Sequence, residues 1–288
     1  MSLSGSLIAC AALLACLQAQ AAGTHVIVTP LGSHDGEFCA LDRALLFEDP
    51  DGTRILYDAG RTVRGSDDTR LGRIDAVLLS HVHGDHLGDV HSAAANAGTC
   101  AKPEFTVRDT PSSNTVGIVV QKKAKLLVGG VEVSSVPAAH SNGLDPAFLD
   151  GDAAQALKAN GLTAYVGPAG GYVVKFTNGL VVYLSGDTGV IADQDLVIRR
   201  LYKANLVVLN IGGTFTVGPT EAAYVINELV KPKGVIASHA NEGATVDGKL
   251  VPDSKTAAFT KAVNVPVYVP LSGKPMAFGG DGRCTSGC

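Results

Sequence analysis

Short apolar runs bounded by Gly, Asp, Asn and Pro recur along the chain from residue 25 onward. Such runs predict strands, whereas longer stretches with apolar residues three and four positions apart predict helices. Strands are predicted over residues 25–30, 44–48, 54–58, 76–80, 105–107, 126–128, 131–136, 172–176, 180–184, 205–210, 234–238 and 265–269. Helices are predicted over residues 87–97, 153–159, 193–202, 220–230 and 254–262, and residues 114–120 fit either state. The alternation of strands and helices in both halves predicts the α/β class.

Turn chemistry adds detail at three places. The linker 49–53 and the pair Asn178-Gly179 each join two predicted strands, and both consist of residues that favour hairpin turns. Thr220 follows a proline and precedes an apolar-periodic run, so it is the predicted N-cap of the helix over 220–230. Segment 141–171 is a Gly-, Asp- and Pro-rich insertion after a strand, which is typical of a lid or a substrate-binding wall.

The N-terminus has the features of a secretory signal peptide over residues 1–22, which leaves a single domain over residues 23–288. Its apolar run, residues 7–17, is too short to span a bilayer, and residues 19–21 (Ala-Gln-Ala) form a small-x-small cleavage site. No Lys or Arg precedes Leu7, so the usual basic segment is missing. A lipoprotein signal ending at Cys16 is the weaker alternative, because Leu14 is unfavoured at its place in that motif. We expect a periplasmic or secreted protein without stable membrane insertion.

Composition narrows the class of protein further. The chain has 288 residues, a formal net charge of -4, 5% aromatic residues and no Trp. It therefore offers neither the basic surface nor the stacking platform of a nucleic-acid-binding protein. Removal of the signal leaves four cysteines, and an even number in an exported protein predicts disulfides in one of three pairings. We favour Cys39 with Cys100 and Cys284 with Cys288; no C-x-x-C pair indicates a cysteine metal site.

Candidate chemistry begins directly after the apolar run 76–80. His81, His83, Asp85 and His86 are four potential metal ligands close together in the sequence. In an extended segment His81 and His83 project to the same side, and Gly84 allows a turn that brings the other two round as a helix begins. A histidine cluster can also be a solvated loop. A buried strand that leads into a ligand-rich turn is, however, typical of a site at the carboxyl ends of strands.

Single ligand-type residues also follow three later strands. His140, Asp187 and His239 each come after an apolar run and precede Gly, Asn or small residues. Alone, each histidine would more often be an ordinary packed or surface residue, but their shared position groups them with the first cluster. The combined five His and two Asp exceed the roughly three protein ligands of one catalytic zinc. Two metal ions that share a carboxylate would use all of them.

The series His81-x-His83-x-Asp85-His86, then His140, Asp187 and His239, resembles the metallo-β-lactamase-fold hydrolase superfamily in order and spacing. This resemblance covers about residues 25–240. It implies an αβ/βα four-layer sandwich, with two mixed β-sheets face to face, helices outside and the metals at one edge. The implied cofactors are two Zn²⁺ ions or other transition metals. It further implies that His81, His83 and His140 hold the first ion and Asp85, His86 and His239 the second, with Asp187 bridging.

The bridging aspartate also distinguishes branches of that superfamily. β-Lactamases of this fold generally lack it, whereas lactonases, glyoxalase II and the tRNA-processing nucleases have it. His83 stands where flavodiiron reductases have Glu, which disfavours a di-iron redox protein. Segments 170–174, 218–223 and 231–233 resemble the branch of ascorbate-6-phosphate lactonase and broad metal-dependent hydrolases. Residues 238–241 (Ser-His-Ala-Asn) depart from it, because relatives often have His-Tyr there, and this departure leaves the substrate open.

The sequence therefore predicts an exported dinuclear zinc hydrolase that cleaves a small ester, lactone or phosphodiester by attack of a metal-bridged hydroxide. Asp85 is the predicted catalytic residue, which orients the nucleophile and passes a proton to the leaving group. A β-lactamase and a non-catalytic metal-binding protein on the same fold are the alternatives. A nuclease is disfavoured by the acidic pI and the lack of a basic arm. The expected partner is a small-molecule substrate, and no feature indicates an oligomeric state.

Further candidates lie in turns near these motifs. Asp58, in Asp-Ala-Gly at a strand end, either hydrogen-bonds a metal-bound histidine or simply forms a turn. Substrate contact and ordinary loop structure are the two interpretations of four other residues, namely Asn142, Tyr165, Thr214 and Asn241.

Overall fold

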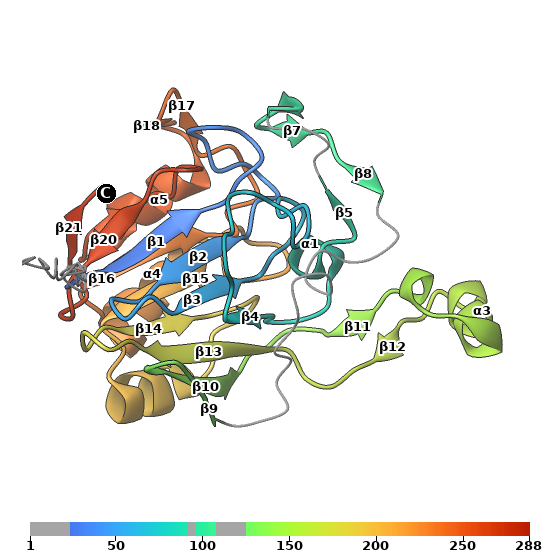
Figure 1. Cartoon of the computed structure of the whole chain (residues 1–288), viewed down its shortest axis with the longest axis horizontal. Helices are drawn as coiled ribbons and strands as arrows, with labels where there is room; N and C mark the ends of the chain where they lie inside the picture. Colours follow the sequence, from blue (N-terminus) through green and yellow to red (C-terminus); the bar gives the residue numbers. More distant parts are fainter. Residues whose placement is uncertain (1–23, 92–95, 108–124) are drawn as a thin grey trace, which may run out of the picture.

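The computed structural model describes residues 24–91, 96–107 and 125–288, and most of its strands belong to two large sheets (Figure 1). The first sheet contains β1 (Val26–Pro30), β2 (Leu45–Glu48), β3 (Arg54–Tyr57), β4 (Ala76–Leu78), β20 (Met276–Phe278) and β21 (Cys284–Ser286), in the spatial order β21-β20-β1-β2-β3-β4. The second contains β9 (Lys125–Val128), β10 (Val131–Pro137), β13 (Gly170–Lys175), β14 (Val181–Leu184), β15 (Leu206–Asn210), β16 (Gly234–Ser238) and β19 (Val267–Tyr268), in the order β19-β16-β15-β14-β13-β10-β9. Both combine parallel and antiparallel pairs, as predicted.

Alternating side chains along these strands divide the apolar residues between an inner core and outer layers. In β15, Leu206 and Val208 join the core between the sheets, whereas Val207 and Leu209 join a second cluster on the other face. This split follows from the two-residue period of a strand, and it explains why β15 is apolar throughout. The sheets are therefore held face to face by the inner cluster, as in the predicted sandwich.

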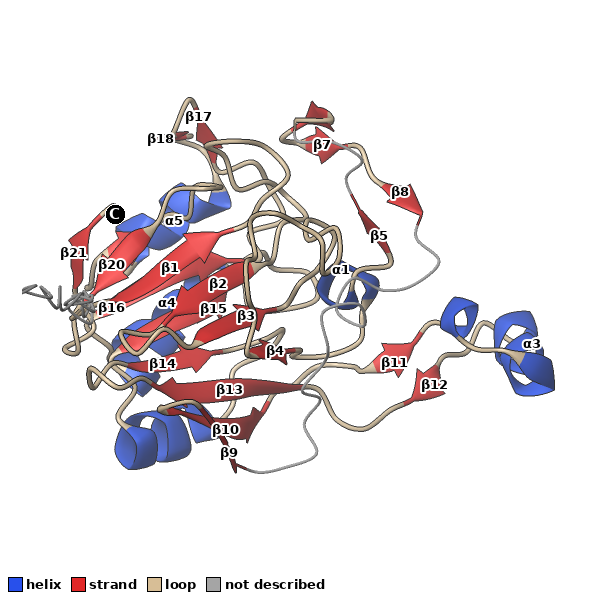
Figure 2. Ribbon diagram, viewed as in Figure 1, coloured by secondary structure: helices blue, strands red, loops and turns tan. Residues whose placement is uncertain are grey.

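Helices cover the outer face of the second sheet (Figure 2). They are η2 (Gln194–Tyr202), α4 (Pro219–Tyr224), η3 (Val225–Val230) and α5 (Lys255–Ala262). Ile198, Ile226 and Phe259 anchor them in the cluster that contains the outer residues of β15. On the first sheet, the outer face packs instead against Val63 and Leu71 of the irregular connection between β3 and β4. The sandwich prediction is confirmed. On the first sheet, the irregular connection between β3 and β4 forms the outer layer.

Two local predictions were wrong at helix boundaries. α1 (Gly84–Leu87) ends at Gly88, which has φ 91°, and the chain then forms β5 (Val90–His91), so the helix predicted over 87–97 is absent at its start, while its residues 92–95 lie outside the described residues. β5 pairs with β8 (Thr106–Val107), so tertiary pairing overrides the local apolar pattern. The N-cap of α4 is Gly218, not Thr220, because Pro219 occupies the first helical position, which its missing N–H and restricted φ suit.

Strands β20 and β21 were not predicted from the sequence. β20 pairs with β1, the first strand of the sheet, although the two are far apart in the chain. Their register joins Val26 to Phe278 and Val28 to Met276. This pairing buries the three residues of β20, and such a short apolar segment gives little local indication of a strand.

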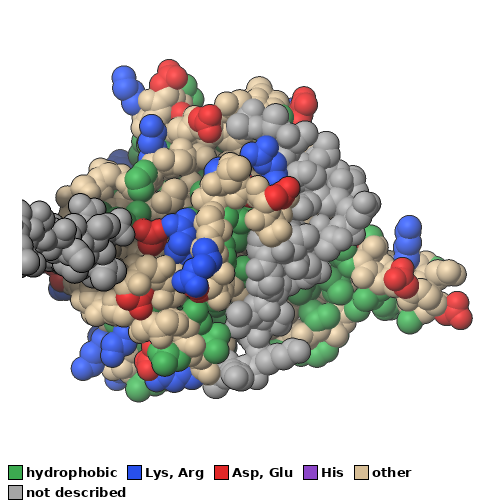
Figure 3. Space-filling view, in the orientation of Figure 1, with side chains coloured by type: hydrophobic (Ala, Val, Ile, Leu, Met, Phe, Trp, Pro, Cys, Tyr) green, Lys and Arg blue, Asp and Glu red, His purple; other side chains and the backbone are tan. Residues whose placement is uncertain are grey.

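Most of segment 141–171 forms an arm that projects from the body, and its last two residues begin β13 (Figure 1). It contains β11 (Gly143–Leu144), the short helix η1 (Pro146–Phe148), α3 (Gly151–Ala159) and β12 (Ala164–Tyr165), which confirms the helix predicted over 153–159. Hydrophobic side chains are visible along the arm in the space-filling view (Figure 3). Leu162 and Tyr165 are 57% and 80% exposed.

Smaller elements complete the described chain. Two short hairpins pair β6 (Gly98–Thr99) with β7 (Lys102–Pro103) and β17 (Thr245–Val246) with β18 (Lys249–Leu250). Disulfides join Cys39 to Cys100 and Cys284 to Cys288, which is the favoured pairing. Among the described residues, no helix has the length and apolar character needed to cross a bilayer. The predicted signal peptide over residues 1–22 and segment 114–120 lie outside the described residues.

Candidate metal centre

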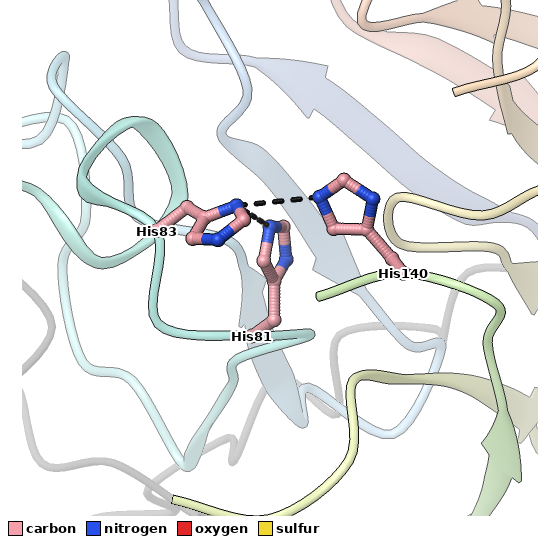
Figure 4. Close-up of side chains that lie close together, drawn as sticks. All are labelled: His81, His83 and His140. Atoms are coloured by element: carbon pink, nitrogen blue, oxygen red, sulfur yellow. Dashed lines mark hydrogen bonds between the residues drawn. The ribbon is translucent and has the colours of Figure 1, made fainter. Parts of the chain in front are cut away.

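Three histidines converge at the ends of two strands (Figure 4). His81 and His83 follow β4 and lead into α1, while His140 follows β10 of the other sheet. Nε2 of His81 and Nε2 of His140 lie 3.0 and 3.2 Å from Nδ1 of His83. Each of these residues offers one nitrogen within 4.8 Å of the other two, so the trio could hold a metal ion.

A second group lies beside the first, at the start of α1 and the end of β16. Asp85 and His86 are in the first turn of α1, and His239 directly follows β16. Oδ2 of Asp85 lies 3.7 Å from Nε2 of His86 and 3.4 Å from Nε2 of His239. These three residues also meet the spacing required to hold a metal ion.

Asp187, which follows β14, touches both groups. Its Oδ2 lies 3.8 and 3.6 Å from Nε2 of His81 and His140 in the first group. The same oxygen lies 3.0 Å from Nε2 of His239, and Oδ1 lies 3.3 Å from Nε2 of His86. The fold therefore brings all seven predicted ligands together at one edge of the sandwich, with Asp187 between the two groups.

The buried atoms of this cluster fit a bound cation. His86 Nε2 and Asp187 Oδ1 are buried 3.3 Å apart but are not aligned as a hydrogen bond, so neither has a hydrogen-bond partner, which is costly unless another species satisfies them. In the first group, His83 Nδ1 faces the Nε2 atoms of both His81 and His140, so three imidazole nitrogens point at one small volume. Imidazole and carboxylate donors at this density are the set preferred by zinc and similar transition metals.

The two groups differ in protonation. Burial lowers the pKa of His81, His83 and His140, so their nitrogen lone pairs are available at neutral pH. Burial acts in the same direction on His86, but the carboxylates of Asp187, Asp85 and Asp58 outweigh it and raise its pKa to about 10. The cation-free protein therefore carries a proton on His86 among three carboxylates.

The two carboxylates of the cluster stay ionised. Burial would raise the pKa of Asp85 and of Asp187, but the charge of His86 and hydrogen bonds from His239 outweigh it and hold both well below the usual range. Arg43 lowers the pKa of Asp85 further. Both side chains are thus available as anionic ligands at neutral pH.

Asp58 orients His86 from the outer side. Its Oδ2 accepts a hydrogen bond from Nδ1 of His86 at 2.8 Å, and the backbone N–H and hydroxyl of Ser80 donate to the same carboxylate, each at 2.8 Å. Of the two interpretations of Asp58, the structure therefore shows the hydrogen bond to a ligand candidate. Asp58 and His239 have φ of 43° and 47°, an uncommon backbone conformation that non-glycine residues adopt mainly at constrained sites.

Arg43 is a residue of the site that sequence reasoning missed. It lies just before β2, and its side chain is 2% exposed. Nε and Nη2 donate to Oδ2 of Asp85 at 3.1 and 2.8 Å, and Nη2 also donates to Oδ1 of Asn241 at 2.9 Å. The sequence gives only a weak indication of this role, a basic residue immediately before a buried strand.

A cavity of about 640 Å³ opens over the metal centre. Thr214 and Asn241 line it, as one interpretation of the sequence proposed, together with Arg43, Phe215 and Lys255. The remaining lining residues are Ala40, Leu41, Ser141, Gly212 and five ligand candidates, namely His83, Asp85, His140, Asp187 and His239. The cavity therefore gives a small molecule access to both groups of ligands.

The two other residues considered for substrate contact do not line this cavity. Tyr165 lies on the projecting arm, and only Ser141 of the segment 141–171 reaches the cavity wall, so the segment is not a substrate wall in this conformation. Asn142 instead makes hydrogen bonds that hold the backbone near His81 and His83. Its Oδ1 accepts from Val82 N at 2.9 Å, and its Nδ2 donates to the carbonyls of Gly167 and Pro168, each at 3.1 Å.

Comparisons with known proteins agree with this geometry. UPF0173 metal-dependent hydrolases from Cupriavidus metallidurans and Polynucleobacter asymbioticus are each 30% identical to the chain. The first match covers 72% of this chain and 71% of the relative, and the second covers 80% and 81%. The solved structure of a metallo hydrolase from Ignicoccus hospitalis superposes with a TM-score of 0.55 at 20% identity, over 88% of this chain and 99% of that one.

A family model for the beta-lactamase superfamily domain matches residues 53–240. This range contains all seven metal-ligand candidates, of which His239 is the last in the chain. The chain therefore belongs to the family of proteins that contain a beta-lactamase superfamily domain, and it is a metal-dependent hydrolase.

Proposed function

We propose that the protein is an exported dinuclear zinc hydrolase that cleaves a small ester, lactone or phosphodiester. The position of Asp187 is the observation that carries this proposal. Its two oxygens lie within 3.8 Å of nitrogens from four histidines, two in each group. A carboxylate placed between two ligand sets is suited to bridge two metal ions.

Metal ions held by these residues would polarise the scissile carbonyl or phosphoryl group and lower the pKa of a water molecule. The chain itself contributes orientation and charge. Asp85 lies in the cavity wall with an ionised carboxylate, so it can accept a hydrogen bond from the attacking water and orient it. Arg43 donates twice to the same carboxylate, which favours this orienting role over the donation of a proton to the leaving group.

Cavity size supports a small substrate. A volume of about 640 Å³ lies in the range typical of small-molecule pockets. Leu41 and Phe215 supply apolar wall, and Lys255 supplies a cation whose Nζ also donates to the carbonyls of Gly212 and Ala240 at 2.8 and 3.0 Å. These groups suit a compact molecule with both apolar and polar parts.

Export is part of the proposal. The apolar run 7–17 and the Ala-Gln-Ala sequence at residues 19–21 have the pattern of a cleaved secretory signal. Disulfides such as those at Cys39–Cys100 and Cys284–Cys288 persist in oxidising compartments. Detection of the processed chain in the periplasm or medium, against its retention in the cytoplasm, tests this part of the proposal.

Metal analysis combined with a substrate panel tests the enzymatic part. We expect about two zinc ions per chain and turnover of at least one class among lactones, aryl esters and phosphodiesters. Asp187→Asn should lose both bound metal and turnover, whereas Asp281→Asn, at an exposed aspartate paired with Arg283, should lose neither. Turnover of β-lactams alone would favour the β-lactamase alternative, and bound zinc without any turnover would favour a metal-binding protein.

A further inference from the structure

Lys255, the first residue of α5, brings a positive charge to the wall of the cavity over the metal centre. Its Nζ donates to the carbonyls of Gly212 and Ala240, at 2.8 and 3.0 Å. These two carbonyls lie just after β15 and β16, so the main chain at two strand ends holds the ammonium in place. An ammonium has three donors, and two carbonyls leave one of them available for a ligand.

The charge of Lys255 has no counter-ion among the described residues. The carboxylate of Glu242 is engaged at the start of α5 instead. It accepts from the backbone N–H groups of Lys255 and Thr256 at 3.0 and 2.9 Å, and from the hydroxyl of Thr256 at 2.9 Å. In the cavity wall, the carboxylate of Asp85 is paired with Arg43. A half-buried cation without a partner of opposite charge is suited to an anionic ligand.

Asn241 adds a second donor to the same wall. Nη2 of Arg43 donates to Oδ1 of Asn241 at 2.9 Å. An arginine can only donate, so the amide oxygen must face Arg43 and the amide nitrogen takes the other position. Among the described residues nothing accepts from Nδ2, although Asn241 lines the cavity. Its φ of 54° is an uncommon backbone conformation that is found mainly at functional sites.

Gly212 leaves room between these two donors. Its carbonyl holds Nζ of Lys255, and a Cβ on Gly212 would lie 2.7 Å from Nδ2 of Asn241 and 2.3 Å from the carbonyl oxygen of His239. A side chain at this position would therefore displace the amide or the backbone beside it. The glycine thus allows a cation and an amide donor to lie close together, next to a candidate metal ligand.

We propose that Lys255 and Asn241 form a specificity subsite that binds an anionic group of the substrate, a carboxylate or a phosphate, apart from the scissile bond. This inference rests on the proposed hydrolase function and narrows its substrate class to small molecules that carry such a group. Lys255 supplies charge and Asn241 supplies a directed hydrogen bond. The subsite lies beside His239, so a bound anion places the rest of a compact substrate over the metal ligands.

Calorimetry on the purified full chain tests the subsite without turnover. The probes share an amide and a three-carbon spacer, and they end in a carboxylate (glutaramate), a phosphonate (4-phosphonobutanamide) or a methyl group (pentanamide). We expect at least one anionic probe to bind about 10- to 100-fold more tightly than pentanamide, the usual effect of a hydrogen bond to a charged group. The tighter anion identifies whether the substrate group is a carboxylate or a phosphate.

Variants connect this preference to the two residues. Lys255→Met removes the charge and should lower the preference about tenfold or more, whereas Lys255→Arg should retain part of it. Asn241→Asp keeps an oxygen for Arg43 but replaces the amide donor by an anion, so it should lower the preference as well. Lys261→Met, at an exposed lysine of the same helix outside the cavity wall, should leave the preference unchanged.

Turnover extends the test to the reaction. On the scissile group that the substrate panel identifies, we compare paired substrates with and without the terminal anion. The ratio of kcat/KM for the charged over the neutral substrate should fall in Lys255→Met, mainly through KM. A lysine that only supports the backbone would affect both substrates equally and leave this ratio unchanged. Lys255→Gln, which can still donate to a carbonyl, replaces the methionine variant if thermal unfolding shows that the latter is not folded.

Two outcomes would overturn the subsite. They are equal binding of charged and neutral probes by the unaltered chain, and a preference for anions that persists in Lys255→Met. Either result would leave the hydrolase proposal intact. Absence of turnover on every substrate class would overturn the hydrolase proposal, whereas the calorimetric preference and its loss in Lys255→Met would still support an anion site, so the two failures are distinguishable.

Discussion

His86 Nδ1 donates a 2.8 Å hydrogen bond to Asp58 Oδ2, and both side chains are buried. The bond leaves Nε2, the other ring nitrogen, directed toward Asp187 at 3.3 Å. A carboxylate behind a metal-binding imidazole fixes its tautomer and its orientation. Asp58, which follows β3, thus sets the orientation of His86, a ligand candidate in α1.

Asp58→Asn should weaken metal binding and hydrolysis by about 10- to 100-fold, the usual effect of removing such a partner. The amide oxygen can still accept the hydrogen bond from the Ser80 N–H, but the amide nitrogen in place of Oδ2 no longer accepts from His86 or presents an anion to it. Metal affinity is measured by chelator competition and turnover on the substrate that the panel identifies. Asp281→Asn is the matched control. Unchanged metal affinity in Asp58→Asn would refute the orienting role.

Asn142→Ala should lower the free energy of unfolding by about 1–3 kcal/mol, because it leaves Val82 N–H and two carbonyls without their partner. Since Val82 lies between His81 and His83, the affinity for the first metal ion should fall as well. Asn142→Asp keeps an acceptor for Val82 and should recover part of the loss. Asn160→Ala, at an exposed helix end, should show neither effect in urea titration or metal binding.

Protonation of His86 predicts a pH dependence for metal binding. Its pKa is raised to about 10 without metal, and a cation needs the lone pair, so binding should release about one proton at pH 8. Calorimetry in buffers of different ionisation enthalpy measures this release. His86→Gln should abolish it, whereas His25→Gln, outside the centre, should not. No proton release in the unaltered protein would contradict the assignment.

The same group predicts how stability changes with pH. A histidine with a raised pKa stabilises the metal-free fold fully below its unfolded value of 6.5, and this contribution is lost as pH rises to about 10. Urea unfolding of the metal-depleted protein should therefore show decreasing stability across that interval. His86→Gln should flatten the decrease, and a profile identical to that of the unaltered chain would contradict the prediction.

Gly186, next to Asp187, should not tolerate a side chain. It has φ 58°, and an added Cβ would lie 2.5 Å from the carbonyl oxygen of Gly170. Gly186→Ala should cost about 3 kcal/mol or more of unfolding free energy and reduce metal affinity. Gly36→Ala provides the comparison, because its φ is 78° with nothing within 4 Å of the added atom, and it should cost only about 1 kcal/mol. Equal costs would show that the contact is unimportant.

Much of the fold was predictable because local patterns agreed with the tertiary structure. Apolar runs such as 205–210 and the Asn178-Gly179 turn specify strands and hairpins through burial and turn conformation alone. Failures occurred where a distant partner decides the outcome. β5 exists because β8 pairs with it, and β20 exists because β1 offers it a free edge.

The sequence by itself determined which side chains could form the metal centre. Each of His81, His140, Asp187 and His239 follows an apolar strand, and strand ends of one orientation meet at one edge of a sheet. Only the tertiary structure decided how these residues are supported. Arg43, Asp58 and Asn142 gain their roles from atoms of residues far along the chain, and a hydrogen bond between distant segments leaves no period or motif in the sequence.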